Sequence, residues 1–319
     1  MKHFRHTSSL THTLIKPLSG LLALGVLQHY RHRREEVITP HTKVVLKNTT
    51  QIQTDPEPDL RIVADPQPAA WSQPVQVPTL YVHGFRGGDY TTNKMVLSAQ
   101  NALHSETYLK VLVDWHGRLT YQGSWSDDPN PLVQIVFEDK WMPTLQIVNW
   151  LSVVLPQLQQ KFHFSAYNAV GHSIGATALV RMEMRHHAQP NFPKLNKLVL
   201  VAGPFDGVVA FGDWPNLNRL NQKGRPMLMN FHYLQLMMGR HHFSSEASVL
   251  NIYGNVDDAT NTDKYISVNS AKSIRYILAP VVKAFHEIEV HGQNAEHSKM
   301  HDDDHVLNLI NEFLFANPQ

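Results

Sequence analysis

Short apolar runs that end in glycine and lead into helical patterns constrain the fold of this chain more than any other feature of its sequence. TLYV, at residues 79–82, precedes His83 and Gly84, and SAYNAV, at residues 165–170, precedes Gly171. Strands that alternate with helices in this way are typical of a mostly parallel, doubly wound sheet with helices on both faces. The sequence therefore predicts an α/β fold whose ligands bind at the carboxyl ends of the strands.

The remaining apolar patterns are consistent with the same sheet. Apolar residues recur at helical spacing in three segments, which predicts helices at 145–162, 173–187 and 305–315. Further strands, each ended by glycine, are predicted at 197–203, 248–254 and 286–292. The alternating stretch at 107–114, followed by Gly117 and LTYQGSW, predicts a β-hairpin.

Composition excludes several classes of site. With 319 residues, of which 42% are hydrophobic, the chain is long enough to bury one large core. It contains no cysteine, so disulfides, thiolate metal sites and cysteine nucleophiles are excluded. The net charge of +1 gives no strong field toward nucleic acid, and we expect no nucleic-acid partner.

The N-terminal part differs in composition from the rest. Residues 1–37 combine a basic start with an apolar run at 17–27, which is about half of the roughly 20 residues that span a bilayer. This pattern resembles a signal peptide without an A-x-A cleavage site and predicts secretion or membrane tethering, with a cytoplasmic leader as the alternative. Residues 38–77 are rich in proline and predict an extended spacer before the globular body at 78–319.

The pentapeptide GHSIG, at residues 171–175, matches the G-x-S-x-G pattern of a nucleophile elbow between a strand and a helix. Flanking glycines let neighbouring chain approach the strained turn, and the helix N-terminus directs N–H groups toward developing negative charge. This context favours Ser173 as a nucleophile over an ordinary Gly/Ser turn. In acyl transfer the oxyanion needs two N–H donors, each typically contributing about 2.7 to 4 kcal/mol. We expect them from the backbone of Ile174 and, in the loop after the first strand, of Phe85.

The acid of such a site comes after the serine and before the histidine in the chain. The strand predicted at 248–254 is followed by Asp257, Asp258 and Asp263. All three lie close enough to the end of that strand to orient an imidazole. Spacing alone therefore does not decide which of the three carboxylates is the acid.

Four histidines lie at the end of the last predicted strand or after it. His291 is too close to the strand, and His301 and His305 lie in or beside the final helix, so His297 is the favoured base. An alternative is a metal site, since His297, His301 and His305 are four residues apart around the aspartates at 302–304 and could share one helix face. H-S-K-M-H lacks the glutamate of H-E-x-x-H, and the aspartates suit a helix N-terminus, so we expect no metal and no cofactor.

Residues 79–315 resemble a family of cell-surface α/β-hydrolases of Gram-positive bacteria, long catalogued as a domain of unknown function. The resemblance lies in VHGF, VLVDWHGRLTYQGSW, NAVGHSIG, NIYGNVDDATNTDKYISVNSAKSIRYIL and AEHSKMHDDDHVLNLINEFLF. Residues 261–264 align with the family's N-S-D-G and His297 with its H-S, which implies Asp263 as the acid. Lys264 replaces the usual glycine, and residues 266–267 stand where Val-Pro is common. The resemblance implies an α/β-hydrolase fold and an extracellular or envelope location, and it supplies no substrate.

Residues 204–246 are irregular and contain an apolar group of Met227, Met229, Phe231, Tyr233, Leu234, Met237 and Met238. This group predicts either a small cap over the site or a helix that packs into the core. The patterns together predict a serine hydrolase of small-molecule or lipid-like esters that acts through Ser173, His297 and Asp263. A non-catalytic binding protein of the cell envelope, and a peptidase or amidase, are alternatives on the same fold.

Overall fold

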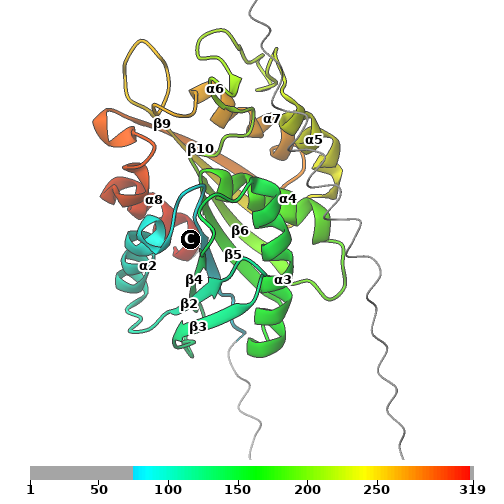
Figure 1. The fold of residues 1–319 in the computed structure, drawn as a ribbon, viewed down its shortest axis with the longest axis vertical. Helices are drawn as coiled ribbons and strands as arrows, with labels where there is room; N and C mark the ends of the chain where they lie inside the picture. Colours follow the sequence, from blue (N-terminus) through cyan, green and yellow to red (C-terminus); the bar gives the residue numbers. More distant parts are fainter. Residues whose placement is uncertain (1–74, 317–319) are drawn as a thin grey trace, which may run out of the picture. The chain divides into compact units, whose positions relative to one another are not determined.

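Eight strands form one sheet in the computed structural model, which describes residues 75–316 (Figure 1). Their order across the sheet is β10-β9-β6-β5-β1-β4-β2-β3, and every neighbouring pair is parallel except β2 and β3. The strands are β1 (Thr79–Val82), β2 (Leu109–Val113), β3 (Leu119–Gly123), β4 (Leu132–Phe137), β5 (Ala166–His172), β6 (Lys194–Val201), β9 (Ser248–Asn255) and β10 (Ala284–His291). The mostly parallel sheet and the hairpin, which is β2–β3, are therefore confirmed.

Helices cover both faces of the sheet. The longer ones are α2 (Asp89–Leu103), α3 (Thr144–Phe162), α4 (Ile174–His186), α5 (Phe231–Gly239) and α8 (Asp304–Phe315). Shorter ones are η1 (Arg240–His242), α6 (Val268–Lys272), α7 (Ile274–Leu278), η2 (Gln293–Ala295) and η3 (Met300–Asp302). Helices α3 and α4 lie on one side of the sheet, and α2 and α8 lie on the other (Figure 1). Side chains alternate along a strand, so Leu80 and Val82 of β1 pack in the core with α3 and α4, and Tyr81 packs with α2 and α8.

Two elements beside the predicted site are absent from the sequence prediction. Strand β4 has the sequence LVQIVF and is buried throughout, and α2 follows the loop after β1. A continuous apolar run such as LVQIVF is typical of a strand covered on both faces, so its signal was present in the sequence. Helix α2 has an even mixture of polar and apolar residues, and its buried side is formed by residues such as Met95, Val96 and Ala99.

The predicted leader, at 1–37, and most of the predicted spacer, at 38–77, lie outside the described residues. The last part of the spacer contacts the sheet domain, because Gln76 Nε2 donates to the backbone oxygens of Ser126 and Asp128 at 2.9 and 2.8 Å.

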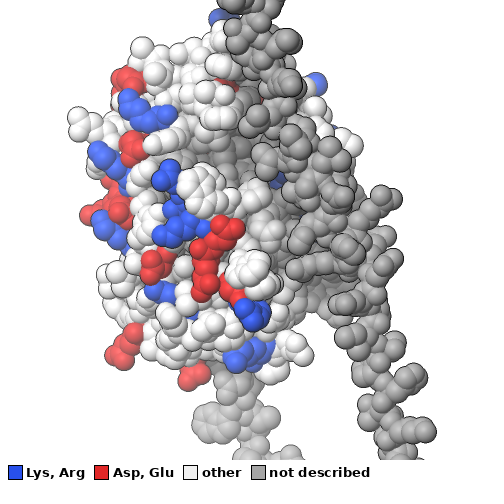
Figure 2. All heavy atoms as spheres, in the orientation of Figure 1, with Lys and Arg blue, Asp and Glu red and all other residues white. Residues whose placement is uncertain are grey.

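No helix among residues 75–316 combines the length and the apolar composition that crossing a membrane requires. On the face drawn in Figure 2, acidic and basic side chains are interspersed.

Some residues of the apolar group predicted within residues 204–246 pack into the core, and others are exposed as in a cap. This segment contains the small pair β7 (Val208–Val209) and β8 (Gly212–Asp213) and then α5. Tyr233 and Leu236 of α5 are buried in the core, whereas Phe231 and Met238 are exposed. Helix α5 therefore packs inward on one side and presents apolar side chains outward on the other.

Glu183 of α4 is a buried carboxyl group that should make the folded chain less stable as the pH rises. Tyr167 Oη donates to its Oε2 at 3.0 Å, and within the described part of the chain its Oε1 has no hydrogen-bond partner. Burial raises the pKa of Glu183 from 4.5 to about 7. Between these values the folded chain holds a proton that the unfolded chain has released, so stability falls across that window, by about 3 kcal/mol at most.

The Glu183→Gln variant removes this titration. We expect its free energy of unfolding to change less than that of the wild type between about pH 5 and about pH 8, measured by urea unfolding. The wild type should be the less stable protein at the higher pH. Parallel pH profiles for the two proteins would show that Glu183 is not the group responsible.

Candidate active site

Ser173 lies on a tight turn between β5 and α4, at the carboxyl edge of the sheet. Its φ and ψ are 57° and −132°, a conformation that costs a non-glycine residue of order 1–3 kcal/mol. The turn is fixed by β6, whose Val201 oxygen accepts the Ser173 N–H at 2.9 Å. A Cβ atom on Gly175 would lie 2.6 Å from the His83 oxygen, and one on Gly84 would lie 2.8 Å from Ser173 Cβ. Both glycines are therefore required for the loop after β1 to approach the turn.

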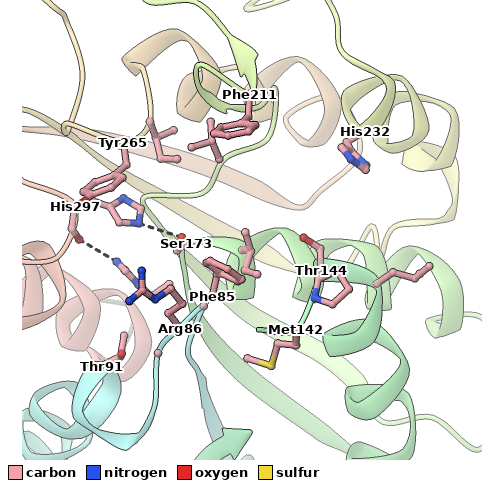
Figure 3. Close-up of a pocket in the computed structure, with 18 of the residues that line it drawn as sticks. Phe85, Arg86, Thr91, Met142, Thr144, Ser173, Phe211, His232, Tyr265 and His297 are labelled. Carbon is pink, nitrogen blue, oxygen red and sulfur yellow. Dashed lines mark hydrogen bonds between the residues drawn. The ribbon is translucent and has the colours of Figure 1, made fainter. Parts of the chain in front are cut away.

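The structure brings Ser173, His297 and Asp263 into one hydrogen-bonded row. His297 Nε2 lies 3.0 Å from Ser173 Oγ (Figure 3), and His297 Nδ1 lies 2.8 Å from Asp263 Oδ2. A carboxylate only accepts, so Nδ1 carries the proton toward Asp263 and Nε2 is left as the acceptor for the Ser173 hydroxyl. The three residues come from the ends of β5, β9 and β10, which meet at one edge of the sheet.

Asp263 is held by the loop around it. Its side chain is buried, and its Oδ1 accepts the backbone N–H groups of Tyr265 and Ile266 at 2.9 and 2.7 Å. Its backbone oxygen also accepts the N–H of His297 at 2.9 Å. The acid and the histidine are therefore joined through both side chain and backbone.

Asp257 and Asp258, the other two candidates for the acid, have partners other than His297. Asp257 Oδ1 lies 2.7 Å from His291 Nδ1 in an exposed pair. Asp258 forms an ion pair with Lys264, whose hydrogen bond lowers the pKa of Asp258 to about 2, with a further contribution from Thr260. Of these three aspartates only Asp263 contacts His297. Lys264 has a φ of 85°, which explains why glycine is common at this position in the family that the sequence resembles.

Phe85 and Ile174, the two residues predicted to supply oxyanion donors, line the same cavity as Ser173. A Cβ atom on Gly84 would lie 3.3 Å from the Ile174 nitrogen, which shows how closely the two segments approach. Within residues 75–316 neither N–H has an acceptor, and both residues line the cavity described below. The two donors are therefore available to a ligand.

His83 holds this loop and was not singled out by the sequence. Its Nε2 accepts the Phe137 N–H at 3.0 Å, so the ring donates from Nδ1 to the Gly84 oxygen at 2.9 Å. Burial lowers the pKa of His83, which favours the neutral ring that this pattern requires. The His-Gly pair after β1 was the available signal for this role.

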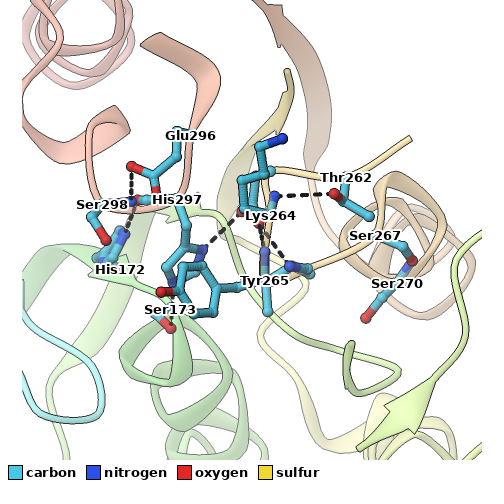
Figure 4. Close-up of polar contacts among 12 residues, drawn as sticks. His172, Ser173, Thr262, Lys264, Tyr265, Ser267, Ser270, Glu296, His297 and Ser298 are labelled. Atoms are coloured by element: carbon cyan, nitrogen blue, oxygen red, sulfur yellow. Dashed lines mark hydrogen bonds and ion pairs between the residues drawn. The ribbon is translucent and has the colours of Figure 1, made fainter. Parts of the chain in front are cut away.

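His172, the residue before Ser173, was also not assigned a role from the sequence. Its ring is buried, and its Nε2 donates to the backbone oxygen of His297 at 3.0 Å (Figure 4). Burial, and then the positive charges that His297 and His301 can carry, lower the pKa of His172 well below its usual value. His172 therefore joins the elbow to the loop that presents His297.

A metal site on His297, His301 and His305 would require one continuous helix, and the structure does not contain such a helix. His297 lies in a loop, His301 in η3 and His305 in α8, so the three rings do not share a helix face. His301 Nδ1 instead lies 2.9 Å from Asp302 Oδ1. Among the described residues no three histidine, aspartate or glutamate side chains are grouped as metal ligands would be.

A cavity of about 1110 Å³ opens at Ser173 (Figure 3). Its apolar side chains include Phe85, Met142, Leu145, Ile174, Phe211 and Phe231. Phe211 and Phe231 belong to the segment at 204–246, so this segment forms part of the cavity wall. Its polar lining includes three arginines together with histidine, hydroxyl and amide side chains, and no carboxylate lines it; the arginines are Arg86, Arg181 and Arg185. A cavity of this size and lining suits a largely apolar organic ligand.

Comparisons with known proteins agree with this architecture. Residues 67–317 match the family described as alpha/beta hydrolase of unknown function (DUF915). Among solved structures the chain is similar to the lin2722 product of Listeria innocua, with a TM-score of 0.67 and 21% identity over 76% of this chain and 96% of that one. It is also similar to a candidate cell surface hydrolase of Lactobacillus plantarum, with a TM-score of 0.61 and 21% identity over 77% and 94%. No curated protein matches the chain significantly.

Proposed function

This chain belongs to the family of alpha/beta hydrolases of unknown function (DUF915), and we propose that it is a serine hydrolase that cleaves a carboxylic ester through an acyl-enzyme on Ser173. The observation that carries the proposal is the 3.0 Å approach of Ser173 Oγ to His297 Nε2, with Asp263 on the other nitrogen of the ring. A nucleophile, a base and a group that orients the base are the minimum for this chemistry.

In the first half of the reaction His297 Nε2 takes the hydroxyl proton as Ser173 Oγ attacks the ester carbonyl. The carbonyl oxygen becomes negatively charged, and the backbone N–H groups of Phe85 and Ile174 donate to it. The carboxylate of Asp263 stabilises the imidazolium that forms. His297 then gives its proton to the departing alcohol oxygen as the carbon–oxygen bond breaks, which leaves an acyl group on Ser173.

In the second half water replaces the alcohol. His297 Nε2 takes a proton from the water as its oxygen attacks the acyl carbonyl, and the same two N–H groups stabilise the oxyanion. The proton returns to Ser173 Oγ when the acyl–serine bond breaks, and the acid is released. The proton that leaves the Ser173 hydroxyl and the proton that leaves water are thus both held by His297 Nε2 before they are passed on, and no cofactor takes part.

The direct test is a series of p-nitrophenyl esters of increasing acyl chain length, assayed beside peptide p-nitroanilides. We expect the esters to be hydrolysed and the anilides to be cleaved far more slowly, with medium chains favoured because the cavity walls are apolar. Preferential anilide cleavage would identify a peptidase or amidase instead. Failure of the folded protein to hydrolyse either series would contradict the proposed esterase and favour a binding protein.

His172 should be a positioning residue in this reaction. The His172→Leu variant loses the hydrogen bond to the His297 oxygen, and a bond of this kind is worth about 1 kcal/mol, so kcat should fall about fivefold. His172→Gln keeps a donor at a similar position and should retain most of the activity. We expect KM to change little in both variants, because the lost contact does not touch the substrate. Equal losses in the two variants would contradict this role.

We also propose that the protein acts at the cell surface or outside the cell, with the cytoplasm as the alternative. The support is the signal-like pattern of residues 1–37 and the description of the Lactobacillus plantarum relative as a candidate cell surface hydrolase. Fractionation of cells that express the full chain should place it in the envelope or the medium. Recovery in the cytoplasmic fraction alone would contradict this location.

A further inference from the structure

The cavity at Ser173 continues along one face of α4. Ile174, Arg181 and Arg185 all line it, and residues seven and four apart on a helix lie on the same face. At about 1.5 Å per residue, the Cα atoms of Arg181 and Arg185 lie about 10 and about 16 Å along the helix axis from Ile174. In Figure 3, Ser173 lies between His297 on one side and Thr144 and His232 on the other, so the cavity extends past Ser173 away from the base.

The two arginines have only uncharged partners in the described part of the chain. Arg181 donates to the Gln235 side chain, and Arg185 donates to Asn149 Oδ1 at 2.9 Å. Neither forms an ion pair with a described carboxylate. Glu183, the acid nearest to them in the chain, is bonded to Tyr167 and is buried.

This arrangement leaves positive charge at the far end of the cavity. Burial, and then the positive charge of Arg185, lower the pKa of Arg181, which still leaves it charged at neutral pH. Each guanidinium has five N–H donors and, within the described residues, donates to one side-chain acceptor. Most of its donors are therefore available to a ligand. No carboxylate lines the cavity to compensate for the two charges.

Apolar side chains also line the cavity, beside the polar side chains of Thr144, His232 and Gln235. Met142 lies just before α3, Leu145 lies in its first turn, and Phe231 is the first residue of α5. A ligand that fills this space therefore meets the nucleophile at one end, an apolar stretch in the middle and a pair of cations at the other end. A planar guanidinium matches the oxygens of a carboxylate or phosphate in a bidentate way.

We propose that the ester cleaved at Ser173 carries an anionic group, a carboxylate or a phosphate, at the end of an apolar arm, and that Arg181 and Arg185 bind this group. The inference rests on the proposed function, because it names the substrate class of that site. Either the acyl arm or the alcohol arm of the ester can occupy the cavity, and both meet the same pair of cations.

The test uses p-nitrophenyl esters that differ only at the far end of the acyl chain. The decanoate ends in methyl, and the decanedioate esters end in a methyl ester or in a free carboxylate; a fourth ester ends in phosphate. Acetate esters of ω-hydroxy acids and ω-hydroxyalkyl phosphates place the same charges on the alcohol arm. We expect kcat/KM for an anionic member of one series to exceed that of its uncharged counterpart by about tenfold or more. High salt should reduce this preference.

The Arg181→Gln/Arg185→Gln variant should lose most of that preference. Lys194→Gln/Lys283→Gln is the matched control, because it removes two positive charges at the amino ends of β6 and β10, away from the cavity. We expect the control to keep the wild-type ratio of anionic to uncharged rates. An unchanged ratio in the arginine variant, or an equal loss in the control, would overturn the proposal.

Binding to the Ser173→Ala protein separates this inference from the proposed function. The probes are the monomethyl ester of decanedioic acid and its uncharged dimethyl ester, measured by calorimetry. Tighter binding of the monoanion that is lost in the arginine variant supports the anion site, even if no ester is hydrolysed. Equal affinity for the monoanion and the dimethyl ester would contradict the anion site. Hydrolysis of uncharged esters by Ser173 would still uphold the proposed function.

Discussion

Replacing Ser173 by alanine should abolish ester hydrolysis and leave the fold intact. The oxygen that attacks the carbonyl is then missing, and His297 has no hydroxyl to activate, so kcat should fall about 10⁴- to 10⁶-fold. Alanine at this position has the same backbone strain as serine, since both carry a Cβ atom at a φ of 57°. The measurement is the initial rate with the best p-nitrophenyl ester, together with circular dichroism and thermal unfolding.

Ser165→Ala is the matched control for this variant. Ser165 is exposed and immediately precedes β5, at the end of that strand away from the cavity. We expect it to keep wild-type activity. If Ser173→Ala retains more than about a hundredth of the wild-type rate, the hydrolysis does not proceed through a Ser173 acyl-enzyme.

Replacing Asp263 by asparagine should lower kcat by about 10⁴-fold. An amide at this position can donate to His297 Nδ1, which would leave the proton on Nε2 and remove the acceptor that faces Ser173 Oγ. It also cannot stabilise the imidazolium. The amide oxygen can still accept the N–H groups of Tyr265 and Ile266, so the loop should keep its conformation.

Asp257→Asn and Asp258→Asn are the controls for the acid. Both residues lie in the same loop, and neither contacts His297. We expect both variants to retain activity within a few-fold of the wild type. Loss of activity confined to Asp257→Asn or Asp258→Asn would assign the acid to that residue and refute the role of Asp263.

The sheet and the turn around Ser173 could be predicted because their signals are local. A strand, a glycine-flanked serine and a helix follow one another within about 20 residues of chain, and each has its own pattern. Strand β4 has an equally clear apolar run but carries no candidate functional residue, and it was missed. Helix α2 was missed because its apolar residues do not form a clear stripe.

The acid could not be chosen from spacing, for a physical reason. Asp257, Asp258 and Asp263 lie in one loop, and the contact that distinguishes Asp263 is with a residue 34 positions away. The tight turn from Asp263 to Ile266, whose N–H groups hold the carboxylate, decides which side chain points inward. Only the family resemblance selected Asp263 before the structure was known.

The roles that we propose for His172, Arg181 and Arg185 also depend on long-range packing. His172 and His297 are 125 positions apart, so no local pattern indicates their hydrogen bond. The two arginines lie on a helix whose sequence gives no sign of which face borders a cavity. That face is set by α3 and α5, which pack against α4 from distant parts of the chain.

Labelling with a fluorophosphonate probe tests the central claim most directly, because the probe reacts only with a serine that a neighbouring base activates. The full chain is treated with the probe, and the modified peptide is identified by mass spectrometry. We expect one adduct, on Ser173, that forms far more slowly in the His297→Ala variant. A folded protein that stays unlabelled, or one labelled at another serine, would contradict the account.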